Sequence, residues 1–254
     1  MNSVHSARTR PLLGRNLTLG LLDILGRSIV IGNYKQSRLP TEAELAEQHG
    51  VSRSVTREAV KMLTAKGLLS ARPRQGTIVQ PTASWNLFDR DVLRWTLERK
   101  YSLGVLRHFN QLRSAIEPEA AALAATYADD EQIKAVGEGL ERMIAAQKGL
   151  DEALDSDIAF HVAVLNASGN PFYAQFSDVV ATALRSSIPI MNRLHGHSAS
   201  VTDHAAVRDA IKRRNPNSAR LAMKKVIAEV LELIATAEKR DNKSINRRSP
   251  RRMR

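Results

Sequence analysis

The sequence of 254 residues contains no cysteine, which excludes disulfide bonds and any cysteine-ligated zinc site. It also lacks an apolar run of about 20 residues, the length that a membrane-spanning helix needs. The N-terminal segment MNSVHSARTR has no apolar core of the kind that signal peptides carry. We therefore expect a soluble, cytoplasmic protein with no membrane partner.

Acidic residues are the minority, since 38 Lys and Arg stand against 26 Asp and Glu and the formal net charge is +12. Such a surplus favours a polyanionic partner such as nucleic acid. The charge is uneven, because residues 239–254 carry eight basic residues and one acid, with almost no apolar side chain. This composition predicts a disordered basic tail at 239–254, and residues 1–16 are expected to form a disordered arm.

A first helix is predicted over residues 17–31, where apolar side chains recur on nearly every helical turn. A second helix begins after Thr41, because Glu44 stands three residues later and the pair forms a capping box. Gly50 ends that helix, since glycine adopts the left-handed backbone of a tight turn without strain. The order of these signals indicates a helix-turn-helix.

Ser52 is the predicted N-cap of a third helix over residues 53–66. The apolar stripe of this helix consists of Val55, Ala59, Met62 and Leu63. Gly67 closes the helix, and the segments that flank RPRQG then predict a short β-hairpin. Residues 17–80 are therefore expected to form a winged helix-turn-helix.

A recognition helix enters the major groove with its N-terminal residues facing the base edges. Arginine can hold guanine or clamp a phosphate, small hydroxylic residues reach phosphates, and a glycine in the hairpin permits close approach to the minor groove. The alternative is that a basic helix is only a solvated face. Here the capping box, turn glycine, basic helix and basic hairpin occur in the order that DNA binding requires. The predicted DNA-binding residues are Ser52, Arg53, Ser54, Thr56, Arg57, Gln75 and Gly76.

The pattern LP-T-E-x-E-L-A…G-V-S-R-x-x-x-R-E-A-V…L…G-L…G-T-x-V resembles the winged-helix domain of the GntR superfamily of bacterial regulators. The resemblance covers roughly residues 17–80 and implies that Arg53 and Arg57 are the main DNA contacts. Many members have arginine between the two glutamates of the second helix, where this chain has Ala43. The resemblance therefore also implies that one usual DNA contact is missing.

Residues 86–240 show no convincing strand pattern, and helical patterns recur there between glycine, proline and aspartate breaks. The predicted fold class is mainly α, with an N-terminal winged helix-turn-helix and a C-terminal all-α helical bundle. A linker is expected at 81–100 and an effector-binding and dimerisation domain at 101–238. The predicted helices of this half are 88–99, 102–127, 130–148, 151–167, 172–194, 200–213 and 216–238.

The C-terminal half resembles the FadR-type (FCD) effector domain. The matching residues are Arg113 and Glu117, Asp157 to His161, Asn166 to Pro171, and His204 with Val207, Ala210 and Ile211. Each of these motifs is loose alone, and their order makes them specific. The resemblance implies four metal ligands, of which the fourth is a histidine where this chain has Val226.

Asp157 and His161 stand four residues apart and share one face of a helix. A carboxylate and an imidazole at that spacing can hold one divalent ion, and His204 on a later helix can close the site. Zinc is the default ion, and nickel or manganese would accept the same ligands. Two alternatives stay open: metal binding is weak or lost, or the histidines are core residues satisfied by Asp157 and backbone groups.

Arg113 is the candidate partner of a small carboxylate effector, because a guanidinium meets a carboxylate in a two-point fork. Equally, Arg113 can form a structural pair with Glu117, one helical turn away. Arg185 can assist the effector, and Asn166 belongs to the matching pattern. The predicted effector-binding residues are Arg113, Glu117, Asn166 and Arg185.

Residues 85–95 contain both tryptophans of the chain and are similar to the same region of galactonate-type repressors, which respond to sugar acids. This similarity implies an aldonate or a hexuronate-derived acid as effector. Trp85, Leu93 and Trp95 are also expected to pack the joint between the domains. The joint at residues 81–95 is the expected relay of the effector signal.

These observations predict a homodimeric transcriptional repressor that binds a palindromic double-stranded operator. The effector can release DNA only if it prefers a dimer geometry that no longer fits both half-sites. One alternative is an architectural DNA-binding dimer without effector. Another is an enzyme whose metal at Asp157, His161 and His204 activates water. No general base is assigned near those residues, and we expect no enzymatic activity.

Overall fold

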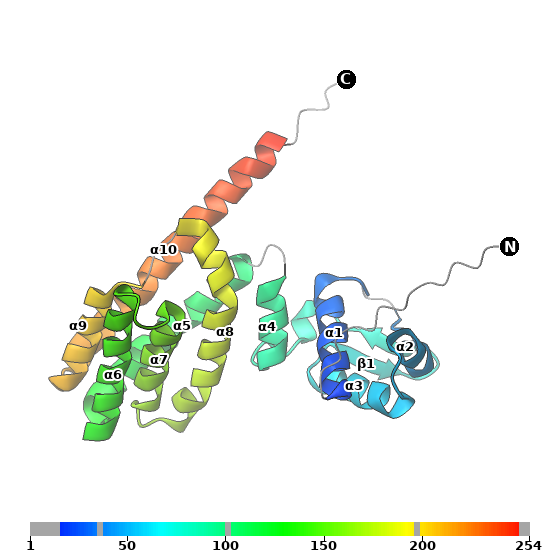
Figure 1. Cartoon of the computed structure of the whole chain (residues 1–254), viewed down its shortest axis with the longest axis horizontal. Coiled ribbons are helices and arrows are strands. Elements are labelled where there is room, and N and C mark those ends of the chain that lie inside the picture. Colours follow the sequence, from blue (N-terminus) through cyan, green and yellow to red (C-terminus); the bar gives the residue numbers. More distant parts are fainter. Residues whose placement is uncertain (1–15, 35–37, 100–102, 196–198, 249–254) are drawn as a thin grey trace. The chain divides into compact units, whose positions relative to one another are not determined.

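The computed structural model describes residues 16–34, 38–99, 103–195 and 199–248, and Figure 1 shows their elements along the chain. The chain forms two compact units, residues 1–100 and residues 101–254. The first holds a small helix-turn-helix with one hairpin, and the described part of the second is entirely helical. This confirms the predicted fold class. No helix within the described ranges is long and apolar enough to cross a membrane.

The first unit begins with a winged helix-turn-helix. Its elements are α1 (Leu17–Ile31), α2 (Glu42–His49), α3 (Arg53–Ala65), β1 (Leu69–Arg72) and β2 (Gly76–Val79). The predicted capping box is present, since the Glu44 N–H donates to Thr41 Oγ1 at 3.3 Å and the Thr41 N–H donates to Glu44 Oε2 at 2.7 Å. Gly50 ends α2 with a φ of 65°, a left-handed conformation that favours glycine.

The two strands pair antiparallel, with Leu69 opposite Val79 and Arg72 opposite Gly76. The segment before α2 joins this hairpin as well, because Arg38 forms an isolated bridge with Ile78. Behind the hairpin lies the core of the unit, whose fully buried members include Leu21, Leu25, Leu45, Ala59 and Leu63. The core therefore fixes α3 and the hairpin to the same framework.

The predicted linker spans residues 81–100, and its described part, residues 81–99, folds onto the first unit. A 3-10 turn (Thr82–Ser84) leads to α4 (Arg90–Glu98), which packs against α1. The ring of Trp95 is 2% exposed and covers Gly26 so closely that a Cβ there would lie 2.3 Å from ring carbons. Trp85 joins the same core, and its Nε1–H donates to Gln80 O at 3.0 Å. The tryptophans thus fill the core of this unit.

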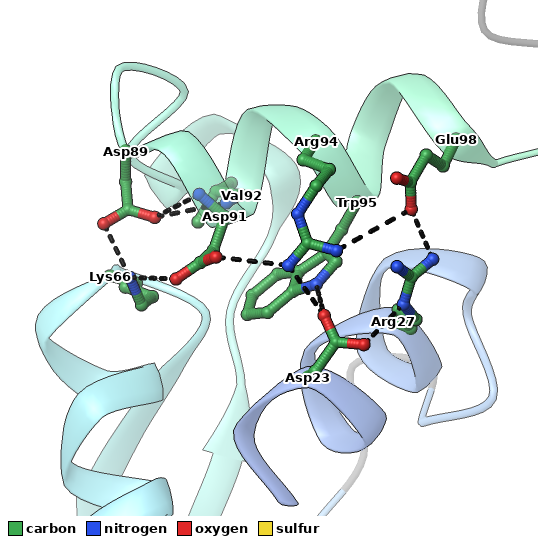
Figure 2. A network of polar contacts seen from close by, with 9 residues as sticks. All are labelled: Asp23, Arg27, Lys66, Asp89, Asp91, Val92, Arg94, Trp95 and Glu98. Carbon is green, nitrogen blue, oxygen red and sulfur yellow. Dashed lines mark hydrogen bonds and ion pairs between the residues drawn. The ribbon is translucent and has the colours of Figure 1, made fainter. Parts of the chain in front are cut away.

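Asp23 of α1 is the centre of a polar network that fastens α4 to the unit (Figure 2). It accepts hydrogen bonds at 2.7 Å from three donors, Arg27 Nε, Arg94 Nη2 and Trp95 Nε1. Burial alone would raise the pKa of Asp23, but the hydrogen bonds from Trp95 and the two arginines outweigh it and lower the pKa to about 2. Asp23 is therefore a carboxylate across the physiological range.

Both ends of α4 take part in this network (Figure 2). At its C-terminal end, Glu98 contacts the guanidiniums of Arg27 and Arg94. At its N-terminal end, Asp89 caps the helix by accepting the N–H of Asp91 at 3.0 Å. Lys66, which follows α3, lies with its Nζ 2.7 Å from Asp89 and 3.0 Å from Asp91. Because α1 and the end of α3 both hold α4, this helix belongs to the first unit.

Six helices form the described part of the second unit. They are α5 (Leu103–Tyr127), α6 (Asp130–Gln147), α7 (Ala153–Asn166), α8 (Pro171–His195), α9 (Val201–Lys212) and α10 (Pro216–Arg248). Pro171 and Pro216 begin their helices, at the position where proline loses no helical hydrogen bond. The small, fully buried side chains of Ala121 and Ala125 on α5 allow neighbours such as Phe160 of α7 to pack close to that helix.

The C-terminal segment corrects one prediction. A disordered tail is predicted over residues 239–254, but α10 continues as one helix to Arg248, and residues 249–254 lie outside the described part of the chain. Lysine and arginine are good helix formers, and no glycine or proline interrupts the chain between Pro216 and Pro250. Because α10 is already nucleated by its packing on α5, each added turn avoids the cost of starting a helix. The predicted arm lies outside the described residues except for Asn16, which caps α1.

Candidate DNA-binding surface and buried ligand site

The start of α3 and the hairpin turn at residues 72–76, which we call the wing, form the candidate recognition surface. Arg53 and Arg57 lie one helical turn apart, and both are exposed. Neither makes a hydrogen bond or an ion pair with any residue that the structure describes. Their guanidiniums are therefore available to an external partner, as the sequence predicts.

The hydroxylic residues of this surface divide into two groups. Ser52 and Ser54 are exposed, and the Ser52 hydroxyl caps α3 by accepting the Val55 N–H at 3.3 Å. Thr56 is fully buried, and its hydroxyl donates to Ser52 O at 3.3 Å. The prediction that Thr56 contacts DNA is wrong, because this position shares the buried face of the helix with Ala59.

The wing presents two further guanidiniums. Arg72, Arg74 and Gln75 are exposed, and the Gln75 N–H donates to Arg72 O at 3.1 Å to close the turn. Arg74 and Gly76 have positive φ values of 63° and 82°. Among the described residues neither Arg72 nor Arg74 has a hydrogen-bond or ion-pair partner. The turn therefore holds two unpaired cations at the tip of the hairpin.

Arginines on the α1–α4 side of the same unit behave differently. Arg27 and Arg94 are held by Asp23 and Glu98 in the network of Figure 2. A cation that is neutralised within the protein contributes little to an external anion, whereas unpaired guanidiniums attract phosphate and release its counterions. The unpaired charge on α3 and the wing thus marks the face suited to DNA.

Asp157, His161 and His204 converge in the second unit, as the sequence predicts. Nε2 of His161 lies 3.4 Å from Nε2 of His204, and Asp157 Oδ1 lies 3.3 Å from His204 Nε2 and 3.8 Å from His161 Nε2. Both imidazoles are 2% exposed, while the Asp157 side chain is 19% exposed. Three donor atoms therefore face one point, which is open on the Asp157 side.

The outer nitrogens of the two imidazoles have their own partners. His204 Nδ1 lies 2.7 Å from Ser200 O, a carbonyl that can only accept, so this nitrogen carries the hydrogen. His161 Nδ1 lies 2.6 Å from Glu117 Oε2, in an orientation that departs from a regular hydrogen bond. With the hydrogen on Nδ1, each neutral ring turns the lone pair of Nε2 toward the other ring and Asp157. This is how histidine ligands are oriented in metal sites.

The donor set fits a divalent ion. Two imidazole nitrogens at about 2.0–2.1 Å from a tetrahedral zinc would lie about 3.3 Å apart, close to the observed 3.4 Å. No fourth metal-binding side chain joins the three in the part of the chain that the structure describes. Val226, at the position of the family's fourth ligand, is 5% exposed within the hydrophobic core. The described residues therefore offer three ligand side chains here.

Arg113 is buried beside these donors and is already paired. Its Nε and Nη2 donate to the Glu117 carboxylate at 2.5 and 3.3 Å, and its Nη1 donates to Asn110 Oδ1 at 3.0 Å. Nη2 also lies 3.2 Å from His161 Nε2. Burial alone would raise the pKa of Glu117, but the charge of Arg113 and the contact with His161 outweigh it and hold the pKa at about 2. The structural pair, one of the two predicted roles, is thus present.

Two predicted effector residues lie elsewhere. Asn166 is exposed at the end of α7 and lines an open groove between α6 and α7. Arg185 is 62% exposed, and its Nη2 lies 2.8 Å from Asp155 Oδ1. Within the described residues, neither makes a hydrogen bond or an ion pair with Arg113 or Glu117, so the structure does not bring the four predicted effector residues together.

Sequence reasoning missed Asn110 and the carbonyl of Ser200. Asn110 stands three residues before Arg113 on α5, and an amide at that helical spacing could have indicated a partner for the guanidinium. The Ser200 carbonyl carries no residue-specific signal, since any residue before α9 would supply it. The Asp23 network was also missed, because its partners lie 71 and 72 residues apart in the sequence.

A winged helix-turn-helix with unpaired guanidiniums, joined to an all-α unit with a buried donor cluster, defines a ligand-responsive DNA-binding transcriptional regulator. Comparison with known proteins agrees with this class. The chain belongs to the gntR family of bacterial regulatory proteins, which residues 20–79 match, and residues 109–229 match the FCD domain. The resemblances to the GntR superfamily and to the FCD domain are thereby confirmed.

The chain is 32% identical over 216 residues to the galactonate operon transcriptional repressor of Escherichia coli (strain K12), covering 84% of this chain and 94% of that protein. It is 38% identical over 168 residues to the uncharacterized HTH-type transcriptional regulator YieP of the same organism, covering 65% of this chain and 73% of that protein. A solved structure of Lar, which controls the expression of the Listeria monocytogenes agr system, matches with a TM-score of 0.50 and 18% identity over 88% of this chain and 98% of that one. That last likeness concerns the fold alone.

Proposed function

We propose that this regulator is a homodimeric repressor whose affinity for a palindromic operator is lowered by a small carboxylate, most simply a sugar acid. The observation that carries DNA binding is the set of exposed, unpaired guanidiniums on α3 and the wing. The choice of a sugar acid and of repression is supported by the 32% identity to a galactonate operon repressor over nearly its whole length. A regulator rather than an enzyme is supported by the same relatives.

The residues proposed to contact DNA are the exposed members of the recognition surface. Arg57 and Arg53 extend from the first turns of α3, where a recognition helix meets base edges and phosphates. Ser52, Ser54, Gln75 and Gly76 surround them with short or flexible groups that allow close approach. Arg72 and Arg74 add phosphate attraction at the tip of the wing.

The buried site is proposed to bind one divalent ion through Asp157, His161 and His204. One guanidinium and two carboxylates leave these buried groups with a net charge of −1 when both histidines are neutral. The lowered pKa values of Glu117 and Asp157 keep both carboxylates ionised at neutral pH, against the effect of burial. A bound divalent ion would reverse the net charge to +1 and supply an open position to which a carboxylate can bind.

Arg113 is placed to orient that carboxylate. Its Nε and Nη1 are committed to Glu117 and Asn110, so its plane is fixed. Nη2 of Arg113 lies 3.2 Å from His161 Nε2, one of the three proposed ligand atoms. An anion that accepts from Nη2 there would be held in one orientation. Glu117 acts through Arg113 and His161 rather than by touching the effector.

The response requires that the effector favour one arrangement of the dimer over another, since equal affinity for both would shift nothing. A palindromic operator is bound by the winged helix-turn-helix units of both protomers only when the distance between these units fits the spacing of the two half-sites. An effector that stabilises a different spacing lowers operator affinity by the ratio of its affinities for the two states.

Thermal unfolding of the full chain, with a panel of aldonic and hexuronic acids, tests this proposal. We expect a sugar acid to raise the melting temperature in the presence of zinc, and a chelator to abolish the increase. Asp157→Asn, which keeps the shape of the side chain, should lose the response, and Arg185→Ala is the matched control that keeps it. A sugar acid that stabilises the chain should also weaken its binding to its own upstream DNA.

Three outcomes would contradict the proposal. DNA binding that no acid in the panel alters would favour an architectural DNA-binding dimer. Consumption of the acid by the chain would favour an enzyme. An increase in melting temperature that is undiminished in chelator would show that the acid binds without an ion, and the ion would be dropped from the proposed site.

A further inference from the structure

Arg38 lies directly against the wing. A Cβ added to Gly76 would stand 2.9 Å from Arg38 Nε and 3.4 Å from its Cζ, so the guanidinium of Arg38 occupies the space that a side chain at position 76 would fill. The backbone is fixed beside the same strand, because Arg38 bridges Ile78 and the Leu39 N–H donates to Thr77 O at 2.8 Å. Both the backbone and the side chain of Arg38 are thus docked on β2.

The guanidinium of Arg38 is available to an external anion. The residue is exposed, and it makes no hydrogen bond to any residue within the described ranges. The nearby acid, Glu44, is committed to the cap of α2, since its Oε2 accepts from Thr41 N at 2.7 Å and from Thr41 Oγ1 at 2.8 Å. The bonds from Thr41 lower the pKa of Glu44, and the charge of Arg38 adds the least to this effect.

The position of Arg38 joins it to the unpaired cations of the wing. Gly76 pairs with Arg72 across the hairpin and lies two residues after Arg74. A guanidinium above Gly76 therefore stands beside the turn from which Arg72 and Arg74 extend. Arginine suits a phosphate there, because its planar fork can donate two parallel hydrogen bonds.

We propose that Arg38 is a phosphate-contacting residue of the recognition surface and that Gly76 serves to seat it. This inference rests on the DNA-binding function proposed above. It assigns Gly76 a role different from close approach of the backbone to the minor groove. It also places a third arginine at the hairpin, supplied by the segment before α2, the helix in which Ala43 replaces the arginine of many family members.

Salt titration of binding to a random-sequence DNA duplex tests the contact without knowledge of the operator. Each phosphate contact contributes about 0.9 to the slope of log affinity against log salt concentration. Arg38→Ala in the full chain should therefore flatten the slope by about 0.9 for each protomer that contacts the duplex. At 0.1 M salt the same contact corresponds to roughly an eightfold loss of affinity, and Arg38→Lys should retain the slope because it keeps the charge.

Two controls separate this inference from the function on which it rests. Lys134→Ala removes a charge that is 77% exposed on α6 and should leave the slope unchanged. Arg57→Ala reports on the recognition surface itself and should weaken binding. If Arg57→Ala loses DNA binding while Arg38→Ala keeps the salt dependence of the unmodified chain, the proposed contact of Arg38 with a phosphate is overturned and the DNA-binding function is not. Absence of DNA binding by the unmodified chain would overturn both.

The role of Gly76 is tested by a double-mutant cycle. Gly76→Ala strains a φ of 82° whatever lies nearby, so its effect on DNA affinity must be compared in two backgrounds. We expect a severalfold loss of affinity when Arg38 is present and a smaller loss in the Arg38→Ala background. Equal losses in the two backgrounds would show that Gly76 does not act through Arg38.

Discussion

For the substitution Gly26→Ala, helix propensity predicts a gain in stability and packing predicts a loss. Gly26 lies within α1, where alanine is favoured over glycine by about 0.5–1 kcal/mol. Its Cα, however, faces the ring of Trp95, and a Cβ at position 26 would lie 2.3 Å from two ring carbons and 2.6 Å from a third. Carbon atoms approach to about 3.5–4.0 Å, so the ring would have to retreat by more than about 1 Å.

The ring of Trp95 is not free to retreat, because its Nε1–H donates to Asp23 Oδ1 at 2.7 Å (Figure 2). Overpacking of a core costs about 1–3 kcal/mol, and a lost hydrogen bond to a charged group adds about 1.5–3 kcal/mol. Subtracting the gain in helix propensity leaves a destabilisation of about 1.5–5.5 kcal/mol. Packing therefore decides the sign, and the first unit should become less stable.

Urea unfolding of the full chain, followed by tryptophan fluorescence, measures this effect selectively. Both tryptophans, Trp85 and Trp95, belong to the core of the first unit, so the signal does not report the unfolding of the second. Gly137→Ala is the control for helix propensity alone, since that glycine also lies inside a helix but a Cβ there meets nothing within 4 Å. Because Gly137 lies in the second unit, the unfolding of this variant is followed by far-UV circular dichroism. A Gly26→Ala chain as stable as the unmodified one would refute the packing argument.

Three further outcomes are expected. Because Asp23 has a pKa of about 2, below its ordinary 3.8, it should contribute stability that is present above pH 4 and lost as the pH falls toward 2. Because the Asp23 side chain is 36% exposed, solvent screening reduces its contribution to the free energy of unfolding from about 2 to about 1 kcal/mol. The acid unfolding of Asp23→Asn should lack this contribution. Glu117→Ala leaves Arg113 buried without a countercharge and should cost about 3–5 kcal/mol in thermal unfolding; a chain that melts unchanged would show that the pair is dispensable. Thr56→Val should leave DNA affinity unchanged because the residue is buried. Arg57→Ala should cost about 1–3 kcal/mol of operator binding if the arginine contacts a base. Both affinities are measured by titration of a labelled duplex.

The parts of the fold that follow from neighbouring residues were predictable from the sequence. The ends of α2 and the start of α3 depend on Thr41, Glu44, Gly50 and Ser52, which lie within or beside the elements that they end. Two of the three proposed ligands were predictable for a similar reason, because a spacing of four residues places Asp157 and His161 on one helix face. His204 lies 43 residues after His161, and it was predicted from the resemblance to the FCD domain. Local signals of this kind act without knowledge of the tertiary structure.

The parts that depend on distant partners were not predictable in this way. Nothing in the sequence near α4 shows that Arg94 would meet Asp23, 71 residues earlier, and the segment was therefore taken for a linker. Thr56 was misplaced because threonine suits a buried helix face as well as a phosphate contact. For Asn166 the sequence gave only membership of the matching pattern, and for Arg185 only a suitable charge, and neither shows which buried groups the side chain meets.

The attachment of α4 has a practical consequence for dissecting the protein. The family match ends at residue 79, which invites a truncated DNA-binding fragment that stops near Pro81. Such a fragment would uncover the apolar strip of α1 around Gly26 and leave Asp23 without two of its three hydrogen-bond donors, Arg94 and Trp95. A fragment that extends through Glu98 would instead keep the whole hydrophobic core of the first unit. The smallest DNA-binding fragment that folds on its own should therefore be about twenty residues longer than sequence homology suggests.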